Sequence, residues 1–119
     1  MAFVTAWIPA GFSKEEKKAF IEGTKKVMLD ALEFPDPRGV SVWLQEYEQE
    51  DMCEHAKLKM VLIAYTTMGK TEEMKQKAAT NFEQLCKDIF GDRKGDTFII
   101  FKEHEKNNLC VRGVLKSNA

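Results

Sequence analysis

The sequence predicts an α+β fold in which two βαβ units form one four-stranded sheet with both helices on one face. Three observations support this prediction. Apolar segments of strand length alternate with amphipathic segments of helix length, a glycine and a helix-capping residue follow two of the strands, and the halves of the chain resemble each other. All 119 residues are expected to form a single domain made of two repeats, about 2–53 and 60–110.

The first unit begins with an apolar strand over residues 2–9, which ends at the Pro-Ala-Gly turn. Ser13 and Glu16 have the spacing of a capping box, in which each side chain bonds the backbone N–H of the other residue. Apolar residues at helical spacing then predict a helix over residues 14–32. After a turn with two prolines and a glycine, strict alternation predicts a second strand over residues 40–47.

The second unit repeats this order. Residues 59–67 form a third strand, whose almost unbroken apolar run predicts burial on both faces. Thr71 is the expected cap of a second helix that ends near Phe90. A fourth strand is predicted over residues 97–102, and residues 110–115 are long enough for a small hairpin strand.

The two halves correspond residue by residue at turns, caps and strand ends. Because such agreement at several kinds of position is improbable by chance, an internal duplication is the strongest signal in the sequence. Two right-handed βαβ units leave one sheet face uncovered, and this predicts a homo-oligomer. The matched positions are Gly11 with Gly69, Ser13 with Thr71, Ala2 with Met60, Glu46-Tyr47-Glu48 with Glu103-His104-Glu105, and Cys53 with Cys110.

Composition and charge exclude several classes of function. Apolar residues make up 44% of the chain and charged residues 31%, which is typical of globular proteins. The 18 basic and 19 acidic residues nearly cancel, so neither nucleic acid nor an anionic membrane surface is an expected partner. The apolar runs are far shorter than a spanning helix requires. The cysteines, Cys53, Cys86 and Cys110, are dispersed and odd in number, which favours reduced thiols in a cytoplasmic protein.

The tandem βαβ units, the strand at the amino terminus and the junctions Gly11-Phe12-Ser13 and Gly69-Lys70-Thr71 resemble the tautomerase superfamily. The resemblance is to its fused, two-unit members, similar to 4-oxalocrotonate tautomerase and cis-3-chloroacrylic acid dehalogenase, and it covers nearly the whole chain. It implies the fold shared with macrophage migration inhibitory factor. It also implies a homotrimer and an isomerase that interconverts enol and keto forms of small 2-keto carboxylates without a cofactor.

The resemblance also implies which residues form the site. The family's catalytic amino-terminal proline is replaced by Ala2, whose primary amine would be the base once Met1 is removed, so weak activity is expected. The arginine after the junction glycine, which holds substrate carboxylates, is replaced by Phe12 in the first unit and Lys70 in the second. Arg38, near the second strand, and Arg112, in the tail, are further candidate cations for substrate binding.

Two alternatives remain open at this point. Instead of an isomerase, the chain could be a catalytically silent protein of the same fold that binds a small anion or serves a structural role. It could also be a dimeric α+β-barrel domain, which has four strands and two helices as well. A metal site is not expected, because Cys53-Glu54-His55 with His104 and Cys110 lacks the spacing of a closed zinc site. Correspondence of Cys53 and Cys110 in the repeat favours packing of both as small buried residues.

Overall fold

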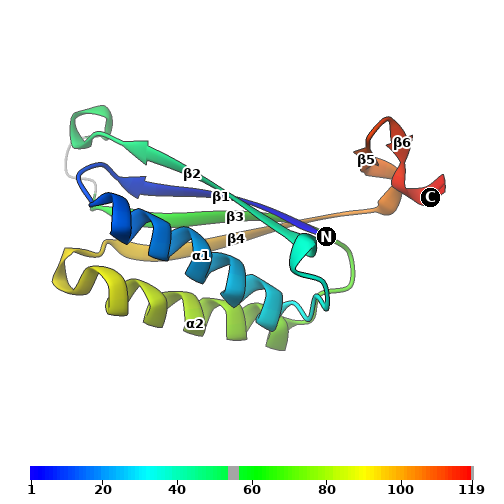
Figure 1. Ribbon diagram of the computed structural model, residues 1–119, viewed down its shortest axis with the longest axis horizontal. Coiled ribbons are helices and arrows are strands. Elements are labelled where there is room, and N and C mark those ends of the chain that lie inside the picture. The colour runs from blue at the N-terminus through cyan, green and yellow to red at the C-terminus, as the bar shows by residue number, and fades with distance from the viewer. Residues whose placement is uncertain (54–56, 119) are drawn as a thin grey trace.

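The computed structural model describes residues 1–53 and 57–118. It contains a four-stranded sheet in the order β2-β1-β3-β4, with both helices on one face and the other face uncovered (Figure 1). A two-stranded hairpin, β5–β6, lies beyond the end of β4. The bounds are β1 Ala2–Pro9, α1 Lys14–Ala31, β2 Val40–Tyr47, β3 Lys59–Thr67, α2 Glu72–Phe90, β4 Asp96–His104, β5 Cys110–Val111 and β6 Val114–Leu115.

The α+β prediction is confirmed, and the two strands of each βαβ unit are parallel, as a right-handed crossover between neighbouring strands requires. Strand β1 pairs with β2 in parallel, and β3 pairs with β4 in parallel. The two units join through β1 and β3, which run antiparallel. The units are therefore related by an approximate twofold axis that passes between these two central strands.

The predicted helix starts are confirmed. Ser13 and Glu16 form the expected capping box, and Thr71 caps α2 by accepting a hydrogen bond from the backbone of Met74. The preceding glycines at both junctions, Gly11 and Gly69, have φ values of 110° and 103°, a region that residues with a Cβ rarely occupy. Each unit thus leaves its strand and enters its helix through the same backbone turn.

The core lies between the sheet and the two helices. Phe20 of α1 and Phe82 of α2 meet edge to face there, with ring centroids 5.8 Å apart. The strands contribute every second residue to this core, including Val4, Leu62 and Ala64, all fully buried. Burying these apolar side chains is the main term that holds the two layers together.

Three sequence predictions differ from the structure. Strand β3 is buried on one face only, because no second layer covers the sheet. Strand β4 runs from Asp96 to His104 rather than over 97–102, since pairing with the full length of β3 extends it at both ends. Cys53 and Cys110 are exposed, so the prediction that both pack in the interior is wrong, and only Cys86 is a buried cysteine.

Neither helix in the described part of the chain has the length and apolar character that crossing a membrane requires.

A candidate site at the amino-terminal end of the sheet

The sheet register brings the start of β1 and the ends of β3 and β4 to the same end of the molecule. Ala2 lies opposite Thr66 on β3, and Thr66 lies beside Glu103 on β4. Ala2 is 1% exposed, whereas Met1 is 43% exposed. The Thr66 hydroxyl donates to the Met1 carbonyl at 3.4 Å, which holds the residue before Ala2 against the sheet. Residue 1 therefore lies where the buried sheet meets solvent.

Lys70 comes to this end because β3 runs antiparallel to β1 and the Gly69 junction follows directly. Its ammonium donates to the Leu32 carbonyl at 3.4 Å and lies 4.4 Å from the centroid of the Phe34 ring. A cation above an aromatic face is attracted by the ring quadrupole. The turn after α1 thus fixes the position of the Lys70 charge.

Two lysine side chains affect the pKa of the amino terminus. Partial burial, followed by the positive charges of Lys70 and Lys116, lowers the pKa of the Met1 amino group from its ordinary value of 8.0. Both causes disfavour the protonated amine. An amine in this position is thereby brought closer to the neutral, basic form at physiological pH.

A cavity of about 350 Å³ opens beside this amine. Its lining combines cations and apolar surface, and it includes no carboxylate. Such a lining suits a small anion with an apolar body, because the cations fix the charged end while the valines contact the remainder. The lining residues are Met1, Val111, Arg112, Val114 and Lys116.

The short hairpin supplies the two side-chain cations of this cavity. Arg112 and Gly113 form its two-residue turn, with φ values of 51° and 80°, as a type I′ turn requires. The Lys116 N–H donates to the Leu109 carbonyl at 2.7 Å and closes the base of the hairpin. The position of Lys116 depends on this local geometry. Lys116 is not among the site residues predicted from the sequence. The Arg112-Gly113 pair, which is typical of a two-residue hairpin turn, could have indicated its position.

Of the predicted site residues, Ala2, Lys70 and Arg112 lie around the amino terminus. Arg38 is at the same end of the sheet, because Val40 pairs with Ala2, but its guanidinium is engaged elsewhere. Arg38 forks onto Asp36, with Nη2 and Oδ2 2.8 Å apart, and its side chain is 91% exposed. Phe12 lies at the opposite end of β1, where its ring packs 4.2 Å from that of Phe90.

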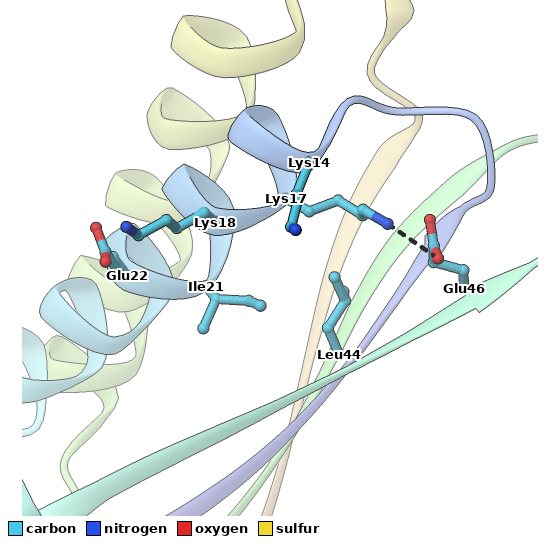
Figure 2. Close-up of a pocket in the computed structure, with 7 residues that line it drawn as sticks. All are labelled: Lys14, Lys17, Lys18, Ile21, Glu22, Leu44 and Glu46. Atoms are coloured by element: carbon cyan, nitrogen blue, oxygen red, sulfur yellow. Dashed lines mark hydrogen bonds and ion pairs between the residues drawn. The ribbon is translucent and has the colours of Figure 1, made fainter.

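A second and larger cavity, of about 510 Å³, lies between the start of α1 and β2 (Figure 2). It is at the far end of β1 from Ala2 and contains none of the predicted site residues. Its lysines include Lys17, which is paired with Glu46 at 3.3 Å, so part of the positive charge is already offset. The smaller cavity is the better candidate because it alone of the two includes the terminal residue.

Metal ligation has no support at either position. Among the residues that the structure describes, no group of three or more histidine, cysteine, aspartate or glutamate side chains could hold a metal ion. Glu54 and His55, considered as ligands from the sequence, lie outside the described residues.

No family model matches the sequence, and no curated protein sequence matches it either. Solved structures do resemble it. Native fused 4-OT has a TM-score of 0.84 at 17% identity, covering 98% of this chain and 97% of that chain. Pt0534 inactivated by 2-oxo-3-pentynoate has a TM-score of 0.85 at 18% identity, with the same coverage. Malonate semialdehyde decarboxylase has a TM-score of 0.77 at 13% identity, covering 93% and 92%.

These likenesses extend over nearly the full length of both chains and agree with the topology described above. The dimeric α+β-barrel alternative is therefore not supported. The fold of this chain is that of the tautomerase superfamily.

Proposed function

We propose that the chain is a member of the tautomerase superfamily that interconverts the enol and keto forms of small 2-keto carboxylates. The observation that carries the proposal is the cavity beside the amino terminus, which combines an amine, two side-chain cations and apolar walls. In this proposal, removal of Met1 places the free amine at Ala2, which acts as the base.

The electrostatics of the site support this role. A general base works best when its pKa lies near the working pH. Burial and the charges of Lys70 and Lys116 lower the pKa of the amine at Met1, and the same surroundings would act on an amine at Ala2. The cations also bind the carboxylate of the substrate, as Lys70, Lys116 and Arg112 surround the terminus.

The proposed activity is weak for a structural reason. The Ala2 amine is primary and is not held in a ring, so its orientation toward the substrate is less restricted than that of a proline nitrogen. Good orientation of reacting groups contributes several kcal/mol to catalysis. Lys70 presents a single point charge where an arginine would present a two-pronged fork. Both substitutions reduce the rate without removing the chemistry.

A homotrimer is part of the same proposal. The uncovered sheet face presents a continuous set of large apolar side chains, which is typical of an interface. Fused 4-OT has been solved as a symmetric trimer with a TM-score of 0.85 to this chain at 18% identity. The exposed residues of this face are Phe3, Trp7, Trp43, Tyr65, Phe98 and Ile100.

A covalent probe tests the amine directly. We propose that 2-oxo-3-pentynoate, the inactivator of Pt0534, adds to the Ala2 amine of this chain. The amine would attack the triple bond conjugated to the ketone, and the full mass of the reagent would be retained. Mass spectrometry should then find one adduct per chain on the peptide that begins at Ala2. A Lys14→Ala variant, changed in the distant cavity, should react equally well.

The outcome that contradicts the proposal is a chain beginning at Ala2 that stays unmodified, or one modified only at lysines. The second candidate function, a silent protein that binds a small anion, predicts a different pattern. In that case pyruvate would bind at Lys70 and Lys116 without any enol–keto turnover.

A further inference from the structure

At the end of the sheet far from Ala2, the Tyr47 side chain contacts the backbone of Lys59. The Tyr47 hydroxyl donates to the Lys59 carbonyl at 2.7 Å and accepts from the Lys59 N–H at 2.9 Å. Tyr47 ends β2 and Lys59 begins β3, so this side chain bridges across the end of β1. The residue of β1 that pairs with Tyr47 is Pro9, which has no N–H that could donate to the Lys59 carbonyl. Tyr47 therefore supplies both hydrogen bonds to a backbone at the start of a central strand.

The repeat places His104 in the equivalent position at the other end. His104 ends β4 as Tyr47 ends β2, and it pairs with Thr67 as Tyr47 pairs with Pro9. Extending the β1–β3 register by one residue puts Met1 opposite Thr67. Residue 104 thus has the relation to residue 1 that Tyr47 has to Lys59.

One atom breaks the symmetry. The Nε2 atom of His104 is buried and has no hydrogen-bond partner among the described residues. Residues 104 and 1 lie on strands that are two strand spacings apart, which is about 9.6 Å, as do residues 47 and 59. An imidazole is shorter than a phenol, so it does not bridge this distance as Tyr47 does. A buried polar atom without a partner costs free energy, which suggests that a ligand atom supplies the missing bond.

Removal of Met1 provides the place for that ligand atom. In the first repeat, the backbone N and O of Lys59 are the groups that the side chain of residue 47 holds. In the second repeat the equivalent groups belong to Met1, the residue whose removal the proposed function requires. A substrate oxygen at this place would lie between the amine of Ala2 and the Nε2 of His104.

We propose that His104 is the second proton-transfer group of this site, and that its Nε2 serves the C2 oxygen of a bound 2-keto carboxylate. This inference rests on the proposed function. In enolisation, the Ala2 amine takes a proton from C3, and the electron pair of that C–H bond forms the C2–C3 double bond. The C2 oxygen takes a proton from the His104 imidazolium. The resulting ammonium and neutral imidazole then exchange a proton through solvent, and ketonisation is the reverse.

Three variants test this role. His104→Leu should lower kcat for enol–keto conversion of phenylpyruvate about 100-fold, the typical contribution of a general acid or base, with little change in KM. His104→Gln retains an N–H donor but transfers no proton, so it should keep the KM and recover only part of kcat. Tyr47→His makes the equivalent change in the other repeat. It should leave kcat at the wild-type value while lowering thermal stability.

Nuclear magnetic resonance gives a readout that is independent of turnover. The ¹⁵N resonance of His104 Nε2, assigned by its absence from His104→Leu, should move when pyruvate is added to a chain beginning at Ala2. A wild-type kcat in His104→Leu, or a resonance that stays fixed while pyruvate binds, would overturn the inference. A wild-type chain without turnover overturns the proposed function and, with it, proton transfer by His104. A resonance that still moves would then show only that Nε2 contacts the bound pyruvate. If pyruvate does not bind either, both proposals fall.

Discussion

The ammonium of Lys70 lies 4.4 Å from the centroid of the Phe34 ring and donates a hydrogen bond to the Leu32 carbonyl. These contacts connect the second repeat to the turn that follows α1 of the first. They fix a positive charge beside the amino terminus, where it lowers the pKa of the amine. Neither repeat alone would form this arrangement.

We expect Lys70→Met to weaken pyruvate binding roughly 10- to 150-fold, because a charged hydrogen bond to a carboxylate contributes about 1.5–3 kcal/mol. The same substitution removes one positive charge and should raise the pKa of the terminal amine. Titration calorimetry and amine titration by NMR measure the two effects. Lys14→Met is the matched control, since Lys14 lines the distant cavity between α1 and β2. Equal affinity in Lys70→Met and the wild type would remove Lys70 from the site.

Replacing Tyr47 by Phe should destabilise the protein by about 1–3 kcal/mol, because it leaves both polar groups of the Lys59 backbone without their partner. Urea denaturation measures this change. The catalytic rate should stay at the wild-type value despite the lower stability, since Tyr47 lies at the far end of the sheet from Ala2. A Tyr47→Phe variant as stable as the wild type would show that solvent satisfies the Lys59 backbone equally well.

Glu16 makes stability depend on pH in the acidic range. The Arg93 side chain, followed by hydrogen bonds from Ser13, lowers the Glu16 pKa from 4.5 to about 2. A carboxylate whose pKa is lower in the folded state contributes fully above pH 4.5, and the contribution is lost as the pH falls toward 2. Glu16→Gln preserves a capping box but not the ion pair, so its stability should change less over this interval. If the stability of the wild type and of Glu16→Gln fell equally between pH 4.5 and 2, Glu16 would not be the source of this pH dependence.

The uncovered face predicts the effect of a charge at Trp43. This side chain is 58% exposed in the single chain and stacks on Phe3, with ring centroids 5.9 Å apart. If the face is a trimer interface, Trp43→Glu buries an unpaired charge and should shift the protein to monomers in light scattering. Lys18→Glu, on the helical layer, serves as the control. A wild-type chain that is monomeric at micromolar concentration would contradict the trimer.

Much of the fold followed from patterns that act over short distances. The capping box at Ser13 and the glycine junctions are local, and the repeat fixed how the two units correspond. The differences between prediction and the single chain came from tertiary context. The apolar run of β3 does not reveal that one sheet face lacks a second layer, and the exposure of Cys110 depends on a hairpin that extends beyond the sheet.

The candidate site was predicted in part, for the same reason. Lys70 follows a junction that the repeat identifies, so its place beside residue 1 could be derived from an antiparallel pairing of the two units. Lys116 could not, because its position depends on the hairpin turn at Arg112-Gly113. The sequence offers His104 only as a possible metal ligand, since nothing in it marks Nε2 as buried without a partner.

The proposed mechanism makes a free amine at Ala2 the base of an enol–keto tautomerase. It is tested by comparing two preparations released from a fusion partner, one beginning at Met1 and the other at Ala2, in the conversion of 2-hydroxymuconate. We expect turnover by the chain that begins at Ala2, little turnover by the chain that keeps Met1, and faster turnover by an Ala2→Pro variant with Met1 removed. Equal rates from both preparations, or no turnover from the Ala2→Pro variant, would contradict it.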